Sequence, residues 1–183
     1  ASIGFIPNFD QNLTFRLASG LYYQSPFYKE LRTTVQDEHG NSIIQLNKNL
    51  KSQRSIHVIA GGDYTFRASG RNFKVSADMY YKLDNLNPYT VDNVKIRYYG
   101  ENCAQGHAMG LDVKFFGEFV PGTDSWISFS LMKAEQSIRG SEYVPMPNSQ
   151  GYNVSLFFQD YFPGYKRVKL NLKGVLSGGL PVT

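Results

Sequence analysis

The stretch Asn72-Phe73-Lys74-Val75-Ser76-Ala77-Asp78-Met79-Tyr80-Tyr81-Lys82-Leu83 decides the fold of this chain. Its odd-numbered residues are apolar or aromatic, and most of its even-numbered residues are polar or charged. A period of two is typical of a β-strand with one apolar and one polar face. This strand spans about eleven residues, more than the roughly 5–6 common in soluble sheets, and it matches the roughly 9–11 that a tilted strand needs to cross a bilayer.

The same alternation recurs in six further segments, which we predict to be strands. They cover about residues 12–24, 56–67, 107–119, 125–135, 152–159 and 167–176. Three connections are short and rich in turn residues, at 66–73, 119–126 and 162–167, and three are long and mostly polar, at 25–52, 84–106 and 136–150. Long and short connections therefore alternate. Outer-membrane barrels have this ordering, because their long loops lie outside the cell and their tight turns lie on the periplasmic side.

Composition narrows the class of protein. The 183 residues include 13 Tyr and 13 Phe, and aromatic residues make up 15% of the chain, which is typical of β-rich proteins. No apolar run approaches the roughly 18 residues of a membrane helix, so helical spans are excluded, whereas a membrane barrel is not. The net charge of +4 is spread along the strands rather than gathered into one patch. We therefore expect no nucleic-acid partner.

These patterns predict an all-β protein, an antiparallel up-and-down meander of about seven long strands that forms part of a larger transmembrane β-barrel. Seven is an odd number, whereas single-chain bacterial barrels have even strand counts and leave no sheet edge in lipid. We therefore interpret residues 1–183 as a single segment of a barrel. Apolar residues such as Met79 and Val113 would face lipid, and aromatic residues near strand ends, such as Trp126 and Tyr161, would lie at the headgroup level.

Several segments carry a resemblance to a known family. Residues 22–32 read YYQSPFYKELR, residues 50–57 read LKSQRSIH, residues 80–86 read YYKLDNL, residues 99–102 read YGEN, residues 110–113 read GLDV and residues 153–164 read NVSLFFQDYFPG. These segments resemble the barrel strands and loops of TonB-dependent outer-membrane receptors. The resemblance covers nearly the whole chain and maps onto the middle-to-late strands of the barrel.

The resemblance implies a barrel of 22 strands around an N-terminal plug. It implies energy-coupled import of a scarce nutrient, such as an iron chelate, a cobalamin or a glycan, across the outer membrane of a Gram-negative bacterium. The implied partners are outer-membrane lipid, a small-molecule or glycan ligand, the plug domain and TonB. We expect the plug and the final strands to lie outside these 183 residues. The shared motifs identify the class of transporter and not its cargo.

No arrangement typical of catalysis or metal binding is found in the sequence. His39 falls in a predicted loop, His57 in mid-strand and His107 at a strand start, each without a second ligand at metal spacing. Cys103 is the only cysteine, which excludes an internal disulfide and a paired-thiolate zinc site. We therefore predict no enzymatic activity, no metal and no cofactor, and we expect the histidines to be solvated or to face the lumen.

The polar phase of the strands supplies the candidate functional residues. These side chains would point into the lumen, where a few near the outer mouth, together with the long loops, would contact the ligand. The candidates are Arg16, Asp63, Arg67, Asp78, Lys82, Asp112, Lys114, Asn153, Gln159 and Lys169. The resemblance transfers no ligand contact to any individual residue, because these contacts differ between members of the family.

Two other kinds of protein fit the same alternation. A soluble or surface β-sandwich that binds protein or carbohydrate also has strands with one apolar face, which point inward to a core. A passive diffusion porin has the same strands without a plug. The ordering of the connections and the resemblance favour the import receptor.

Overall fold

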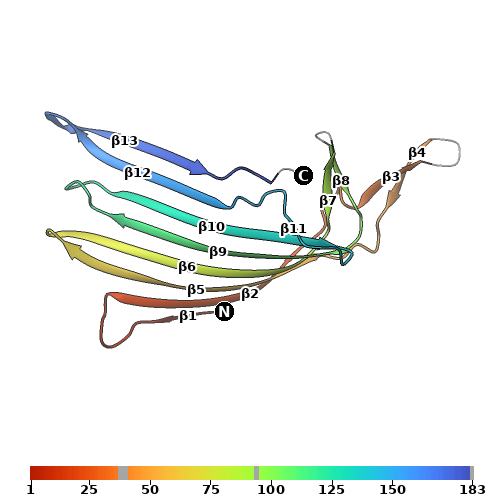
Figure 1. Ribbon diagram of the computed structural model, residues 1–183, viewed down its shortest axis with the longest axis horizontal. Helices are drawn as coiled ribbons and strands as arrows, with labels where there is room; N and C mark the ends of the chain where they lie inside the picture. Colours follow the sequence, from red (N-terminus) through yellow and green to blue (C-terminus); the bar gives the residue numbers. More distant parts are fainter. Residues whose placement is uncertain (37–40, 93–94, 182–183) are drawn as a thin grey trace.

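The structure is a computed structural model that describes residues 1–36, 41–92 and 95–181. Within these ranges the chain forms one large antiparallel sheet and two small two-stranded sheets. The same ranges contain no helix long and apolar enough to cross a membrane. The order along the large sheet is β1-β2-β5-β6-β9-β10-β12-β13, so each strand of this path lies beside the one before it (Figure 1). This order confirms the predicted all-β, up-and-down meander.

The large sheet contains the seven long strands that the alternation predicts. They are β2 (Leu13–Gln24), β5 (Gln53–Ala68), β6 (Arg71–Leu86), β9 (Ala104–Gly117), β10 (Ser125–Ile138), β12 (Tyr152–Phe162) and β13 (Tyr165–Ser177). Six of the seven extend beyond the predicted bounds at one or both ends. The open sheet has an additional short edge strand, β1 (Ser2–Phe5), and β11 (Val144–Pro145) pairs with β10. Neither of these short strands is predicted by the sequence.

The two small sheets lie in long connections that the sequence predicts only as polar loops. One is the hairpin of β3 (Arg32–Gln36) and β4 (Ser42–Leu46), and the other pairs β7 (Tyr89–Asp92) with β8 (Lys95–Tyr98). These strands have four or five residues each. Such short segments, set among polar residues, do not repeat an alternation often enough to be recognised.

Two of the tight turns have two residues each. Ser69 and Gly70 join β5 to β6 with positive φ angles of 51° and 75°, as in the hairpin loops whose backbone twist matches that of the strands. Pro163 and Gly164 join β12 to β13, and Gly164 has a φ of 80°. Proline fixes the first φ of such a turn and glycine accepts the positive second one. Both turns are shorter than predicted, because the alternation continues up to them.

Tight turns and long connections lie at opposite ends of the large sheet. In Figure 1 the β5–β6, β9–β10 and β12–β13 turns are at the left, and the β3–β4 and β7–β8 hairpins project at the right. We call these the turn end and the loop end. For the described residues this confirms the predicted sorting of connections. The predicted loop position of His39 lies outside the described residues.

Register divides the side chains between two faces. Successive residues of a strand point to opposite faces, and residues paired in register share a face. The apolar face carries rows such as Leu17–Ala60–Met79–Leu111–Leu131–Tyr152, and the polar face carries rows such as Arg16–Gly61–Asp78–Asp112–Ser130–Asn153. Each row is displaced from the next row on its face by two residues along the strands.

The apolar face is exposed. Met79 on the central strand β6 is 62% exposed, and Leu172 on β13 is 60% exposed. Among the described residues, the buried hydrophobic side chains are those of Ala104, Ala108 and Ala134. In the same ranges, all extensive contacts between elements join strands that are hydrogen-bonded neighbours, so no second sheet packs on this face. The strand ladders therefore hold the sheet together without a two-layer core.

Candidate functional site: the polar face and the loop-end pocket

All ten candidate residues lie on the polar face. Register places there Arg16, Asp63, Arg67, Asp78, Lys82, Asp112, Lys114, Asn153, Gln159 and Lys169. The structure brings three of them, Arg16, Asp63 and Asp78, into direct contact and distributes the others over the face. Their contact with a ligand remains a prediction.

Arg16 is the centre of a charged network on β2, β5 and β6. Its Nη2 donates to both carboxylate oxygens of Asp78, at 2.9 and 3.1 Å, and its Nη1 donates to Asp63. Asp63 also accepts a hydrogen bond from the Ser76 hydroxyl at 2.5 Å and lies 3.4 Å from the Lys74 ammonium. The side chain of Asp63 is only 12% exposed, so these donors replace water around a carboxylate that is largely shielded.

Gly61 makes this network possible, because it lies between Arg16 and Asp78 in their row. A Cβ at this position would lie 1.9 Å from the Asp78 Oδ1 and 2.7 Å from the Ala77 carbonyl oxygen. The missing side chain therefore leaves the space in which Arg16 crosses β5 to reach Asp78. Glycine at position 61 therefore permits a close side-chain approach.

Two lysines of the polar face lie against aromatic rings. The Lys114 ammonium is 4.8 Å from the centroid of the Trp126 ring, and that of Lys82 is 5.1 Å from the Tyr80 ring centroid. Both distances fall within the range of a cation–π contact. Asp112 lies between Asp78 and Ser130 in its row. The middle of the polar face therefore presents charges of both signs next to aromatic surface.

The remaining candidates do not join the network. Near the turn end, Arg67 Nη2 donates to the Gly70 carbonyl at 3.2 Å, and Lys169 Nζ donates to the Gly122 carbonyl at 3.2 Å. Gln159 donates to Asn171 at 2.8 Å, and the Asn153 amide oxygen accepts a hydrogen bond from Ser155 at 2.9 Å. The contacts of Arg67 and Lys169 stabilise turns.

The histidines lie on different faces. His57 is on the polar face, with its ring centroid 4.5 Å from that of Tyr22. His107 is on the other face, where its Nε2 lies 3.4 Å from the Glu135 carboxylate and its side chain is 19% exposed. Sequence reasoning missed this pair because its residues meet only across two strands. Among the described residues, no group of three His, Cys, Asp or Glu side chains could hold a metal ion.

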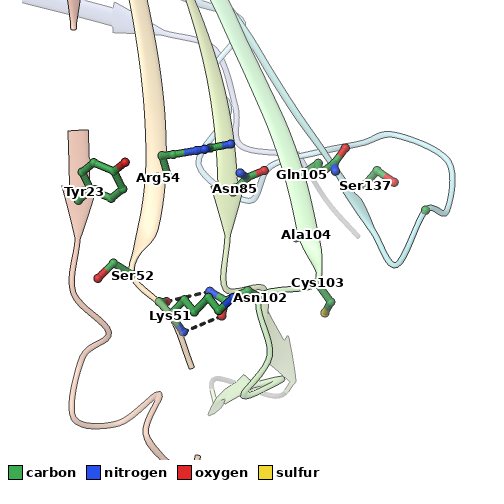
Figure 2. Close-up of a pocket in the computed structure, with 11 residues that line it drawn as sticks. Tyr23, Lys51, Ser52, Arg54, Asn85, Asn102, Cys103, Ala104, Gln105 and Ser137 are labelled. Atoms are coloured by element: carbon green, nitrogen blue, oxygen red, sulfur yellow. Dashed lines mark hydrogen bonds between the residues drawn. The ribbon is translucent and has the colours of Figure 1, made fainter. Parts of the chain in front are cut away.

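A pocket missed by sequence reasoning opens at the loop end on the same side as the apolar face. One row lines it, formed by Tyr23, Arg54, Asn85, Gln105 and Ser137 (Figure 2). The cavity has a volume of about 710 Å³. The sequence did contain a signal for this pocket, because Arg54, Asn85 and Gln105 are polar residues in the apolar phase of their strands. We call this cavity the loop-end pocket.

The segments around the pocket are tied together by hydrogen bonds of the buried Glu30 and Asn87 and of the exposed Asn102. Glu30, which is 3% exposed, accepts hydrogen bonds from the Phe27 backbone N–H and the Asn87 side chain, each at 3.2 Å. The Asn102 side chain donates to the Lys51 carbonyl at 2.8 Å and accepts from the Lys51 N–H at 2.7 Å (Figure 2). These bonds join the first two long connections. Glu30 and Asn102 belong to the segments that carry the family resemblance.

Charged residues in the segments next to the pocket are paired with one another. The Arg139 guanidinium donates to Glu101 at 2.9 Å, and this hydrogen bond raises the pKa of Arg139. The Lys133 ammonium lies 3.0 Å from the Glu135 carboxylate. Cys103 has a free thiol that is half-buried and lines the cavity. Arg54 and Lys51, which line the pocket, differ from these charged residues, because no described residue binds either cationic group.

Comparison with known proteins identifies no relative, since no protein-family model matches the chain and no curated protein or solved structure is significantly similar to it.

Proposed function

We propose that this chain forms part of the barrel wall of a TonB-dependent outer-membrane receptor that imports a scarce nutrient. The exposed apolar face is the observation that carries the proposal. Large apolar side chains cover one side of seven long strands, and among the described residues no second sheet packs on them. A contiguous surface of this extent is unfavourable in water and is what a lipid-facing barrel wall requires.

The edge of the apolar face supports a bilayer as the covering medium. On the four central strands, the first polar residues of the apolar phase toward the loop end are Arg54 on β5, Asn85 on β6, His107 on β9 and Lys133 on β10, whereas on β2 Ser19 already interrupts this phase beside Val58. Arg54 and Asn85 share a row, whereas His107 lies one row and Lys133 two rows closer to the turn end. The edge shifts by four residues, about 13 Å, over three strand spacings of about 4.8 Å, a slope of about 40°. Strands of membrane barrels are tilted by about 35–45°.

Aromatic side chains at the turn end support the same proposal. Phe66, Phe73 and Phe115 stack with centroid distances of 5.7–6.4 Å, and Phe119 packs edge-on against Phe73 at 5.6 Å. This cluster is close to the β5–β6 turn. Membrane barrels carry aromatic girdles at both interfaces, where the rings sit between hydrocarbon and water.

The polar face would then line the lumen. The network of Arg16, Asp63 and Asp78 uses charges of both signs, and such surfaces suit contact with water, a polar plug or a polar ligand. Long connections at the loop end would contribute to ligand capture. The cargo class, whether an iron chelate, a cobalamin or a glycan, follows only from the resemblance and is not narrowed by the residues on this face.

A soluble β-sandwich is the second candidate, and it would need another sheet to cover the apolar face about 10 Å away. The slope of the apolar edge favours the membrane instead. A bilayer surface is a flat boundary between apolar and polar surroundings that crosses tilted strands at an angle, whereas a sheet packed in water meets no such boundary. A porin is the third candidate. Sequence upstream of residue 1 discriminates it from a receptor, since a plug has a mixed α/β pattern.

Fractionation of cells that produce the full-length protein tests the proposal. We expect the protein to stay in the outer-membrane fraction through washes with high salt and freeze–thaw cycles, and to be released only by detergent. A peripheral protein and a membrane barrel measured in the same fractions serve as controls. Release by salt or freeze–thaw alone would overturn the membrane assignment.

A further inference from the structure

The loop-end pocket has the charge of an anion site. Its described lining includes two cationic side chains, Lys51 and Arg54, and no carboxylate. The carboxylates of Glu101 and Glu135 in adjoining segments are paired with Arg139 and Lys133. An anion that enters the pocket would therefore meet two cations that have no partner among the described residues, and no like charge on the pocket wall.

The side chains beside these cations supply neutral hydrogen-bonding groups. Figure 2 shows Arg54 extended across the sheet toward Asn85, with Gln105 and Ser137 following on the next two strands. Arginine presents a planar fork of donors that matches the oxygens of a phosphate group. Amide and hydroxyl groups next to it suit the polar remainder of a headgroup. Asn102 holds the backbone of Lys51 through two hydrogen bonds and so fixes the base of its side chain.

An apolar track begins directly below the pocket. One row closer to the turn end, Ile56 and Leu83 replace Arg54 and Asn85, and both are exposed, at 39% and 48%. The track leads to a mostly apolar hollow of about 580 Å³ on the apolar face, lined by residues that include Val58, Ala60, Met79, Tyr81 and Leu111 and, at its edge, Lys133. Small Ala60 leaves space between larger neighbours. Cationic pocket and apolar hollow thus follow one another on the same face, in the order of a headgroup and an acyl chain.

We propose that the loop-end pocket binds the phosphate-bearing headgroup of an anionic lipid, whose acyl chain lies along Ile56 and Leu83 into the hollow. This inference rests on the proposed function, because it requires that the apolar face meets a bilayer. Arg54 contacts the phosphate, and Lys51 adds a second positive charge. The site lies on the outer wall of the sheet and is separate from the polar face that would contact cargo.

The test measures lipid binding to the detergent-solubilised full-length protein by native mass spectrometry. The probe is phosphatidylglycerol, the lipid without phosphate is a diacylglycerol with the same chains, and the phosphate without chains is glycerol 3-phosphate. We expect Arg54→Gln to weaken phosphatidylglycerol binding about tenfold, or about 1.4 kcal/mol, with a smaller loss for Lys51→Gln. Lys173→Gln, which removes the same charge from the polar face of β13, should leave the binding unchanged.

Each other outcome overturns the proposal. If diacylglycerol binds as tightly as phosphatidylglycerol, the phosphate does not contribute to binding. If glycerol 3-phosphate competes as well as the lipid, the pocket is a site for free phosphate rather than for a lipid. If phosphatidylglycerol binding is unchanged in both Arg54→Gln and Lys51→Gln, the loop-end pocket is not the lipid site. Lys51→Gln provides the test if Arg54→Gln does not fold. Failure of the proposed function is seen separately, because the protein would then leave the membrane fraction without detergent.

Discussion

A cation placed in the middle of the apolar face should destabilise the protein far more than one placed at its edge. Met79 is 62% exposed and lies about five residues, or roughly 16 Å along β6, from the edge between Leu83 and Asn85. In the proposed bilayer, with strands tilted by about 40°, this distance corresponds to a depth of about 12 Å, which is half of an apolar band about 25 Å tall. We therefore expect Met79→Arg to lower the free energy of unfolding by about 2–4 kcal/mol.

Two matched variants isolate the cause. Met109 has the same side chain on the same face, 42% exposed, but it lies at the apolar edge and is paired in register with Lys133. Met109→Arg should cost only about 0–1 kcal/mol. Ser130→Arg adds the cation to the polar face, opposite Asp112 in register, and should change stability by no more than about 0.5 kcal/mol.

The assay is reversible urea unfolding of the full-length protein in lipid vesicles, with the free energy obtained from the midpoint and slope of each transition. Equal losses for Met79→Arg and Met109→Arg would refute the reasoning, because depth in the bilayer is the property in which these two sites are designed to differ. A loss for Ser130→Arg as large as that for Met79→Arg would mean that the two faces are not differently solvated.

Two further predictions concern the network on the polar face. Arg16→Ala, Asp78→Ala and the double variant should give a coupling energy of about 1 kcal/mol that shrinks at high salt, since the pair is partly exposed; additive losses would contradict a direct interaction. Gly61→Ala should lower the urea midpoint because its Cβ would lie 1.9 Å from the Asp78 Oδ1, whereas Gly174→Ala on β13 has nothing within 4 Å and should be tolerated; equal midpoints would show that Gly61 is not needed for space.

Much of the fold could be predicted because the alternation in Phe73–Leu83 and its counterparts depends only on which residues are apolar. Period two defines a strand and its two faces without any knowledge of the neighbours. The short strands β1, β3, β4, β7 and β8 were missed because four or five residues contain too few repeats to stand out. The pairs β3–β4 and β7–β8 form when their hairpins close, and β1 pairs with the edge of β2.

The candidate site was predicted only as a face, because its contacts join distant residues. Arg16 and Asp78 are 62 positions apart in the chain and become neighbours through the registers of two strand pairs. A shift of one residue in either register would move one partner to the other face. For the same reason, the sequence could indicate that Arg54 is out of phase with its apolar neighbours, but not that Asn85 and Gln105 continue its row.

The turn end of the sheet supplies a second, independent edge to compare with the sloping edge at the loop end. The reference is the row of paired residues that joins Leu13 on β2 to Leu156 on β12. The turn-side end of β2 lies in this row, and the turn-side ends of β5, β9 and β12 lie four, two and six residues beyond it. From β2 to β12 this is about 20 Å over five spacings of about 4.8 Å, again a slope of about 40°. Compared between the first and last of these strands, each edge lies closer to the turn end on the later strand, although the turn-side end of β9 lies two residues behind that of β5. Apolar residues determine the first edge and turn residues determine the second, so the sequence of one edge does not impose the other. Two parallel planes that cross tilted strands would produce both edges at once, and the proposed bilayer has two such surfaces.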